Sequence, residues 1–497
     1  MGNLTIIQFF HWYYPSENNL WLHAAEQAAH LKEMGFNFAW LPPAYKSAKG
    51  DTEPGYAVYD LYDLGEFYQK GSIRTKHGTR EEYLRAIGAL RDNGIGVLAD
   101  VIFNHRFHGD GKEIATIQKV STENRTEFEG EPMSTDVSTV YNFPGRNKKY
   151  SNYTWDHHSF SGTSVNGEIF MIHNEYTNGT WGKVISNQFG NFDYLMGDDV
   201  EFRNPFVREE LKQWGKWYIE NTGVAGFRLD ALKHMPTDYY AEWIDFLKDT
   251  FRRDFFFIGE CWRNDRQMLM EYLDQTAGRI QLFDVPLHAN FFEASQKGRD
   301  YDLRSIFNNT LVQVRPERTI TFVDNHDTQP LQALESFVEA WFKPLATAVI
   351  LLREQGIPCV FYPAVYGAAY SDEANGQTRN IKIEPVPGIE RMLHARRDLA
   401  FGYQHDYFDH PNVVGWTRGG KDEMALSGFA VLISNGDDGY KTMSVGRRNA
   451  TKVFVDLLGH RPEKVTIDQD GGAEFFVSAG SVSVWVDEKY LSVENNK

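Results

Sequence analysis

The chain has 497 residues, more than one ordinary domain, so two or three domains are expected. A hydrophobic share of 42% and a charged share of 24% are typical of a soluble globular protein. The 51 basic and 68 acidic residues give a net charge of -17, which argues against a nucleic-acid or anionic-membrane partner, and no apolar run approaches the roughly 18 residues that span a bilayer.

Eight strand-like segments follow one another along the chain, and most are followed by a helix-like stretch. Several are near-continuous apolar runs, which is typical of parallel strands covered on both faces. This β/α repeat predicts an α/β fold with a (β/α)8 TIM barrel, in which active-site residues lie at the carboxyl ends of the strands. The segments are Thr5–Phe10, Asn37–Leu41, Gly96–Phe103, Val224–Asp230, Phe255–Glu260, Ile280–Phe283, Thr319–Asp324 and Pro358–Tyr362.

The third strand is followed by a long interruption of the β/α repeat. About a hundred residues separate His105 from Asn204, too many for a structureless loop. Their short segments, rich in Gly, Asn, Thr and aromatic residues, indicate an inserted, irregular β-rich domain. The barrel then resumes with a helix. We expect this helix to begin at Pro205, with Asn204 as its N-cap, and to end at Gly223.

After the eighth strand, a polar loop (370–380) and a further helix-like stretch lead to a change of pattern near Gly402. From there to Val486, short alternating segments with Asn-Gly and Asp-Gly turns predict an antiparallel β-sandwich of structural role. We therefore expect a barrel over residues 1–105 and 205–400, an inserted domain over 106–204, and a C-terminal domain over 401–497.

Two further features bear on the cellular compartment of the protein. Cys261 and Cys359 both lie in strand-like segments, so buried thiols are expected and a disulfide framework is excluded. The start MGNLTIIQFFHWYY contains no basic stretch followed by an apolar core and a cleavage site. We expect a cytoplasmic monomer.

Four short strings carry polar residues at the ends of strand-like segments. A barrel would bring these ends together and place Asp230, Glu260 and Asp327 around one point. Such a group of carboxylates can break a glycosidic bond. The strings are DVIFNH (Asp100 to His105), GFRLDALKH (Gly226 to His234), FIGECW (Phe257 to Trp262) and FVDNHDTQ (Phe322 to Gln329).

The neighbours of these carboxylates suggest different roles. Arg228 and Asp230 are two residues apart on a strand and share a face, so the guanidinium would lower the pKa of Asp230 and keep it ionised, as a nucleophile requires. A structural ion pair is the other interpretation. The apolar strand before Glu260 would raise its pKa and keep it protonated as a general acid, although a carboxylate that caps the next helix is also possible.

The four strings resemble, in their residues and in their order along the chain, the signature regions of the α-amylase family of glycoside hydrolases (family 13). GYAVYDLYDLGEF (Gly55 to Phe67) and NFDYLMGDDV (Asn191 to Val200) add to a likeness that covers nearly the whole chain. The chain is most similar to the liquefying-type bacterial members, particularly the intracellular ones, whose starts resemble QFFHWYYP. The resemblance implies an endo-acting, retaining hydrolase of α-1,4-glucosidic bonds in starch, glycogen and malto-oligosaccharides.

The resemblance also implies a role for individual residues. Asp230 would be the nucleophile, Glu260 the acid/base, and Asp327 the residue that holds and distorts the sugar. The carboxyl groups of a retaining pair lie roughly 5–5.5 Å apart. The substrate-binding residues implied by the family are Tyr56, as a stacking platform, with His105, Arg228, Lys233, His234 and His326.

One bridging Ca²⁺ ion is implied by the same resemblance, and its ligands are of the oxygen type that calcium prefers. The implied ligands are Asn104, Asp193, Asp199 and the main-chain carbonyl of His234. The denser metal cluster of the liquefying relatives is disfavoured, because Ser161 stands where an aspartate would be expected and Gly182-Lys183 fills the other acidic position. We hypothesise that the Lys183 ammonium partly replaces a missing ion.

Three alternatives remain at this level. A maltogenic exo-amylase, an α-1,6-glucosidase or a glucanotransferase would keep the same carboxylates and differ in its loops. A non-catalytic carbohydrate-binding relative would typically lack one of the three carboxylates, and all three are present. A barrel enzyme for phosphorylated metabolites would need a glycine-rich phosphate loop near the last two strands, which TFVDNHDTQP and IPCVFYP do not supply.

Overall fold

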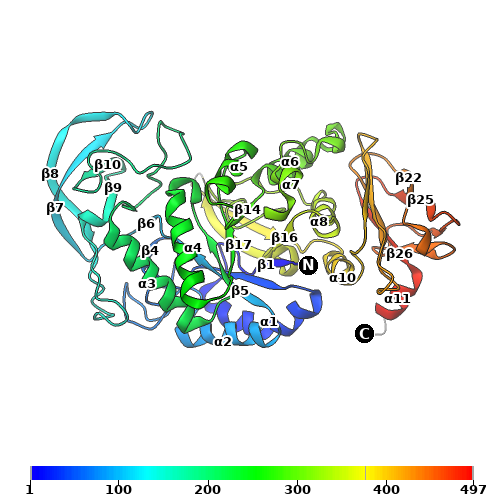
Figure 1. Cartoon of the computed structure of the whole chain (residues 1–497), viewed down its shortest axis with the longest axis horizontal. Helices are drawn as coiled ribbons and strands as arrows, with labels where there is room; N and C mark the ends of the chain where they lie inside the picture. The colour runs from blue at the N-terminus through cyan, green and yellow to red at the C-terminus, as the bar shows by residue number, and fades with distance from the viewer. Residues whose placement is uncertain (1–2, 375, 495–497) are drawn as a thin grey trace.

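The computed structural model describes residues 3–374 and 376–494, and the predicted domain limits at Met1 and Lys497 lie outside these residues. Three parts follow one another along the long axis of the molecule (Figure 1). A sheet inserted after the third barrel strand lies at one end, the barrel lies in the middle, and the C-terminal sheets lie at the other end.

The central part is a closed barrel of eight parallel strands in the order β1-β16-β15-β14-β13-β12-β5-β2. Seven of the eight strand-like segments of the sequence contain one of these strands, and the eighth overlaps β16, which begins one residue earlier at Ile357, so the predicted barrel is confirmed. The strands are β1 (Ile6–Gln8), β2 (Phe38–Leu41), β5 (Gly96–Val101), β12 (Gly226–Leu229), β13 (Phe256–Gly259), β14 (Gln281–Phe283), β15 (Thr319–Phe322) and β16 (Ile357–Phe361).

Helices surround the barrel because most of them bury one apolar face against the strands, while α8 is buried on nearly all sides. In α3, the side chain of Asn204 accepts a hydrogen bond from the backbone N–H of Phe206, Pro205 takes the first helical position, and Gly223 ends the helix with a φ of 67°, as predicted. The helices of this layer are α1 (Leu20–Met34), α2 (Arg80–Asp92), α3 (Pro205–Thr222), α4 (Thr237–Phe251), α5 (Arg266–Gln275), α6 (Val285–Lys297), α7 (Leu311–Val314), α8 (Lys343–Leu352), α9 (Tyr362–Tyr366) and α10 (Ile389–Asp398).

The inserted part is a six-stranded antiparallel sheet in the order β6-β11-β9-β10-β7-β8. The strands β7 and β8 are much longer than the short segments expected from the sequence, because they pair with each other almost continuously. The sequence did not predict their length, since most of β8 is exposed and carries no apolar pattern. The strands are β6 (His105–Arg106), β7 (Gly111–Val120), β8 (Phe128–Val140), β9 (Phe160–Val165), β10 (Glu168–His173) and β11 (Asp198–Val200).

The C-terminal part consists of two antiparallel sheets that pack on a shared core, as the alternating pattern predicts. Buried side chains of Met443, Phe454, Phe475 and Trp485 fill this core. The larger sheet has β19 (Gln404–Tyr407), β20 (Val413–Arg418), β21 (Phe429–Ser434), β26 (Val482–Asp487), β23 (Val453–Asp456) and β24 (Lys464–Thr466), the smaller has β22 (Gly439–Ser444) and β25 (Gly472–Val477), and α11 (Glu488–Glu494) follows.

The segment 370–380, expected to be a polar loop, lies largely within a hairpin of β17 (Ala368–Ala374) and β18 (Gln377–Ile383). Its position 375 lies outside the described residues. The prediction was wrong because most of the side chains of the hairpin are exposed, so backbone pairing forms strands without an apolar repeat. A second small hairpin joins β3 (Lys46–Ser47) to β4 (Val58–Asp60).

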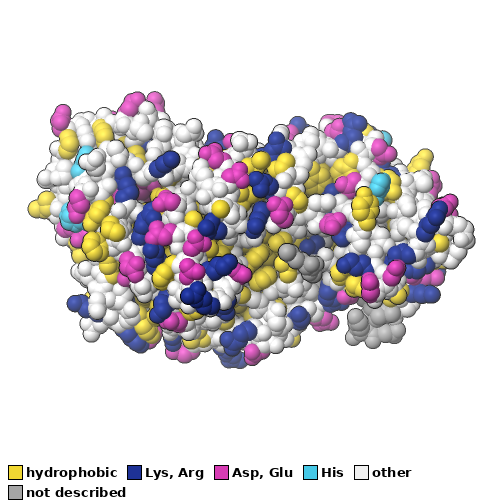
Figure 2. All heavy atoms as spheres, in the orientation of Figure 1, with side chains coloured by type: hydrophobic (Ala, Val, Ile, Leu, Met, Phe, Trp, Pro, Cys, Tyr) yellow, Lys and Arg dark blue, Asp and Glu magenta, His cyan; other side chains and the backbone are white. Residues whose placement is uncertain are grey.

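Cys261 and Cys359 are both buried and free, as predicted. Within the part of the chain that the structure describes, no helix is both long enough and apolar enough to cross a membrane. On the face shown in Figure 2, acidic and basic side chains are interspersed over the described surface and do not gather into one large patch of either sign.

Candidate active site

Arg228, on β12, lies at the centre of a group of buried carboxylates inside the barrel. Its side chain is fully buried. Nη1 donates hydrogen bonds to Oδ1 of Asp100 at 2.9 Å and to Oδ1 of Asp230 at 2.5 Å, and Nη2 donates to Oε2 of Glu260 at 2.9 Å. One guanidinium therefore joins the ends of three neighbouring strands, β5, β12 and β13.

The register of the barrel explains why Asp230 and Glu260 lie at the same height. Leu229 of β12 is paired with Gly259 of β13, so the residue after each strand emerges at the same level of the barrel. The backbone N–H of Glu260 donates to the carbonyl of Leu229 at 2.9 Å. Ala231 then adopts a left-handed conformation with a φ of 53°, an unusual one for a residue with a Cβ, and so turns the chain directly after Asp230.

Glu260 is held in a way that favours its protonated form. Burial raises its pKa to about 8, the negative charges of Asp230 and Asp327 act in the same direction, and the charge of Arg228 opposes them. Both Arg228 and the backbone N–H of Ala231, at 3.3 Å, donate to the same oxygen, Oε2. Oε1 is therefore the oxygen left to carry a proton.

Asp100 is a member of this group that the sequence did not single out. Trp40 donates from Nε1 to Oδ2 of Asp100 at 3.0 Å, and the hydroxyl of Tyr56 donates to the same oxygen at 2.7 Å. Burial raises the pKa of Asp100 to about 6 against the opposing charge of Arg228. The only signal in the sequence is that Asp100 opens the string DVIFNH inside an otherwise apolar strand.

Asp327 and His326 follow β15 and face the same centre. Nε2 of His326 lies 3.5 Å from Oδ2 of Asp327, and the side-chain amide of Gln8 donates to Nδ1 of His326 at 3.0 Å, which leaves the proton of the neutral ring on Nε2. Burial, helped by the charge of Arg228, lowers the pKa of His326 well below its usual value. Withdrawal from solvent raises the pKa of Asp327, although its side chain is one-quarter exposed at 26%.

Stacked aromatic rings form one wall of the site. The ring of Tyr56 lies 5.0 Å from that of His326 at an interplanar angle of 19°, and 5.4 Å from that of Trp12 at 18°. His105 contacts the backbone of this wall, since its Nε2 lies 3.0 Å from the carbonyl of Tyr56. Trp12 was missed as a site residue, although it lies within the string QFFHWYYP.

Lys233 and His234 lie in a short 3-10 turn, η3 (Leu232–His234), and contact the inserted segment instead of the central carboxylates. Nδ1 of His234 lies 2.7 Å from the carbonyl of Phe192, and Nζ of Lys233 lies 5.1 Å from the centre of the Phe192 ring. Nζ of Lys233 also donates to the carbonyl of Trp262 at 3.1 Å. Burial lowers the pKa of both side chains, that of His234 to about 3.

Three of the expected calcium ligands lie near one another at the junction of barrel and inserted sheet. Nδ2 of Asn104 lies 3.3 Å from Oδ1 of Asp199, and both Asp193 and Asp199 are buried. Burial raises the pKa of Asp193 to about 7 and that of Asp199 further, and the charge of Asp193 adds to the effect on Asp199. Two buried carboxylates that repel each other, next to an amide group, are a donor set that a hard divalent cation would stabilise.

The residues that replace the expected acidic positions contact these same carboxylates. Ser161 donates from Oγ to Oδ2 of Asp199, and the backbone N–H of Gly182 donates to Oδ2 of Asp193 at 2.8 Å. Lys183, however, is exposed, so the structure does not support the hypothesis that its ammonium replaces a buried ion. The cations that lower the pKa values of Asp193 and Asp199 are Arg203 and Arg125 respectively.

Known proteins match this chain over most of its length. The family model Alpha-amylase, described as the alpha amylase catalytic domain, matches residues 24–382. The chain is 46% identical to the cytoplasmic alpha-amylase of Escherichia coli (strain K12), over 99% of this chain and 100% of that protein, and 43% identical to an alpha-amylase of Geobacillus stearothermophilus, over 98% and 87%. The crystal structure of alpha-amylase I from Eisenia fetida superposes with a TM-score of 0.66 over 97% of both chains, a likeness of fold at 14% identity. The chain belongs to the alpha-amylase family.

Proposed function

We propose that the protein is an endo-acting hydrolase of α-1,4-glucosidic bonds in starch, glycogen and malto-oligosaccharides. The observation that carries this proposal is the pairing of Asp230 and Glu260 through Arg228 within an alpha-amylase chain. Asp230, the proposed nucleophile, accepts a charged hydrogen bond from Arg228, while burial favours the protonated form of Glu260, the proposed acid. A retaining glycosidase requires this division.

The chemistry would proceed in two steps. Glu260 protonates the glycosidic oxygen while Asp230 attacks the anomeric carbon, so the bond to the leaving sugar breaks and a β-glycosyl ester forms. The ionised Glu260 then takes a proton from a water molecule, which attacks the same carbon and releases Asp230 together with an α-anomeric product. Both steps need Glu260 to change its protonation state, and a raised pKa near the working pH suits that role.

The other residues would position the sugar. Asp327 and the neutral His326 would bind hydroxyl groups of the reacting ring, and the face of Tyr56 would stack against it, with Trp12 extending the apolar surface. Arg228 would act mainly by orienting the two catalytic carboxylates. His105, Lys233 and His234 would line the cleft next to the inserted segment.

We further propose one calcium site. The ligands would be the side chains of Asn104, Asp193 and Asp199 and the main-chain carbonyl of His234. The contact between Nδ1 of His234 and the carbonyl of Phe192 supports this assignment, since it ties η3 to the segment that carries Asp193. A bound Ca²⁺ ion would neutralise the buried carboxylates and hold the inserted sheet against the barrel, and it would take no part in the bond cleavage.

The proposed division of the chain is a barrel over 1–105 and 205–400, an inserted domain over 106–204 and a C-terminal domain over 401–497. The proposed partner is an α-glucan, and the proposed state is a cytoplasmic monomer. The identity of 46% with a protein described as a cytoplasmic alpha-amylase supports the location.

Two experiments would test the function. The first follows the size of amylose during early digestion: rapid loss of long chains supports endo action, whereas a single small sugar from the start would indicate the maltogenic alternative. The second compares Asp230→Asn and Glu260→Gln with Asp254→Asn, an exposed carboxylate that precedes β13. We expect the first two to lose turnover by about 10³-fold or more with an unchanged fold, and the control to keep full activity.

A further inference from the structure

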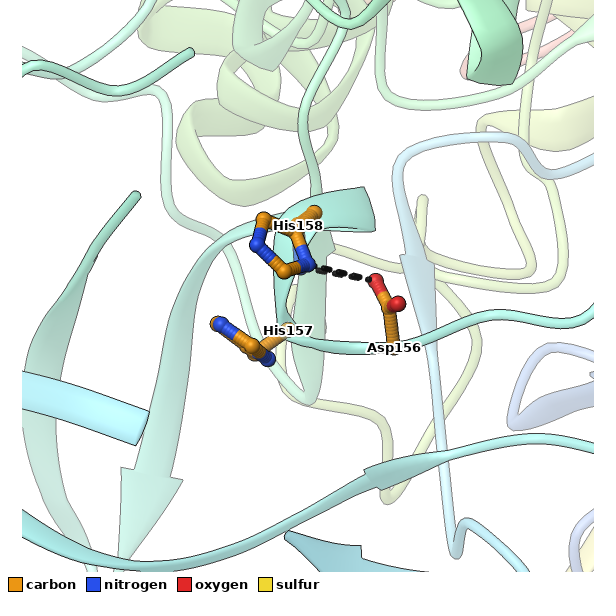
Figure 3. Close-up of side chains that lie close together, drawn as sticks. All are labelled: Asp156, His157 and His158. Carbon is orange, nitrogen blue, oxygen red and sulfur yellow. Dashed lines mark hydrogen bonds and ion pairs between the residues drawn. The ribbon is translucent and has the colours of Figure 1, made fainter. Parts of the chain in front are cut away.

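We propose that the inserted sheet carries a second metal site, for a divalent transition metal such as Zn²⁺, formed by Asp156, His157 and His158 (Figure 3). One ligand atom from each of the three side chains lies within 4.8 Å of the other two. The site is separate from the residues proposed for Ca²⁺, and it does not depend on the proposed glucan hydrolysis.

The local backbone explains why three consecutive residues point their side chains together. Asp156 precedes a single 3-10 turn, η2 (His157–Ser159), and its Oδ1 accepts a hydrogen bond from the backbone N–H of His158 at 2.9 Å. Nδ1 of His158 lies 3.2 Å from the same oxygen, a contact drawn as a dashed line in Figure 3, and the centres of the two imidazole rings are 3.9 Å apart. The tight turn therefore brings two rings and one carboxylate close together.

Two further carboxylates lie beside the imidazole rings. Oε2 of Glu113, from β7, lies 2.6 Å from Nδ1 of His157, and Oε2 of Glu175 lies 3.4 Å from Nε2 of His158. Carboxylates in contact with metal-binding imidazoles orient the ring and increase its basicity, or serve as ligands themselves. Three carboxylates around two imidazoles form an anionic setting that a divalent cation would neutralise.

The ligand set distinguishes this site from the proposed calcium site. Imidazole nitrogen suits Zn²⁺, Ni²⁺ and Cu²⁺, whereas Ca²⁺ takes mainly oxygen ligands. Two histidines and a carboxylate, with one position open to water or to a neighbouring glutamate, match a four-coordinate zinc ion. The proposed calcium ligands, in contrast, present oxygen atoms only.

The position of the turn indicates what the metal would do. The carbonyl of His158 accepts a hydrogen bond from Nδ2 of Asn204, the residue that caps α3, at 3.0 Å, and the carbonyl of Ser159 accepts from the backbone N–H of Glu201 at 2.9 Å. The turn thus lies where the inserted sheet leads back into the barrel. A metal ion bound there would fix this junction and raise the stability of the protein through preferential binding to the folded state.

The test uses the full-length protein with Ca²⁺ in excess, so that oxygen-type sites are already occupied. Zn²⁺ is titrated in competition with a chromophoric chelator, and thermal unfolding is followed with and without Zn²⁺. We expect one Zn²⁺ per chain and an unfolding temperature that rises with Zn²⁺. In His158→Gln, the affinity should fall at least tenfold and the rise should disappear, since this half-exposed side chain is lost without removing the Asp156 cap.

A matched control is His30→Gln, which removes another exposed histidine near a glutamate, with Nδ1 of His30 3.9 Å from Glu33, on the distant helix α1. It should bind Zn²⁺ as the native chain does. Glu175→Gln provides a second variant in case His158→Gln alters folding, and it should weaken binding to a smaller extent. Equal Zn²⁺ affinity in the native chain and in both site variants, or no Zn²⁺ bound while Ca²⁺ is present, would overturn the proposal.

Discussion

Nη2 of Arg228 donates a hydrogen bond of 2.9 Å to Oε2 of Glu260, across the neighbouring strands β12 and β13. The other terminal nitrogen of the same guanidinium is occupied by Asp100 and Asp230. The planar fork of an arginine allows this arrangement, because its nitrogens point in fixed and different directions. The orientation of the proposed acid and that of the proposed nucleophile are therefore coupled through one side chain.

Replacement of Arg228 by lysine should separate these contacts, since a single ammonium group cannot replace both nitrogens. We expect kcat/KM to fall by about 10²-fold or more, and the stability to fall by about 1–3 kcal/mol because a buried carboxylate loses its hydrogen-bond donor. Steady-state kinetics and thermal unfolding would measure both effects. Arg279→Lys, in a partly exposed pair with Asp245, is the control and should cost about 1 kcal/mol or less; native-like kinetics in Arg228→Lys would contradict the assigned role.

The raised pKa of Glu260 should make stability depend on pH in a defined direction. The pKa is about 8 in the folded protein and about 4.3 in an unfolded chain, so between these values the folded state holds a proton that the unfolded state releases. The stabilising contribution of Glu260 is complete at low pH and is lost as the pH rises towards 8. Glu260→Gln removes this titration, so its advantage over the native chain should grow with pH, by on the order of 1 kcal/mol per pH unit.

Thermal unfolding of the native chain and Glu260→Gln at several pH values between 5 and about 8 would measure this difference. Glu131→Gln, at an exposed position of β8, is the control and should show a difference from the native chain that is independent of pH. A constant difference between the native chain and Glu260→Gln would mean that Glu260 is ionised in the folded state and is not the proposed acid.

Trp12→Ala should weaken substrate binding more than it slows the chemical step. The Trp12 ring extends the stack formed by Tyr56 and His326, and its ring contacts are with these aromatic side chains. We expect KM for malto-oligosaccharides to rise by about tenfold with kcat nearly unchanged, the pattern of a uniform binding contact. Trp341→Ala, which removes a partly exposed tryptophan after β15, is the control and should leave KM unchanged. A large fall of kcat with an unchanged KM in Trp12→Ala would refute the stacking role.

Asp199→Asn should abolish the proposed calcium site, because it removes one of two buried anionic ligands. Metal analysis after dialysis should find one Ca²⁺ per native chain and none in the variant, and a chelator should lower the unfolding temperature of the native chain only. Asp198→Asn is the matched control, since this adjacent buried carboxylate of β11 is held by Thr163 and Tyr141. More than one tightly held Ca²⁺ per native chain, or loss of Ca²⁺ in Asp198→Asn, would contradict the proposed ligand set.

The sequence by itself was sufficient for the barrel and for most of the candidate centre. Both follow from local sequence patterns. Apolar runs indicate buried parallel strands, and the polar residues that end these runs lie at the same edge of a closed barrel. Asp230, Glu260 and Asp327 could therefore be placed near one another without coordinates. The start and end of α3 were likewise predictable, because caps act within a few residues.

Only the tertiary structure decided which residues surround that centre. Asp100 and Trp12 belong to the site through contacts with residues more than forty positions away, and no periodicity records such contacts. The exposed strand β8 and the hairpin of β17 and β18 form through backbone pairing, which leaves little trace in side-chain pattern. The grouping of Arg125 and Arg203, instead of Lys183, around the buried carboxylates depends in the same way on how the inserted sheet folds back onto the barrel.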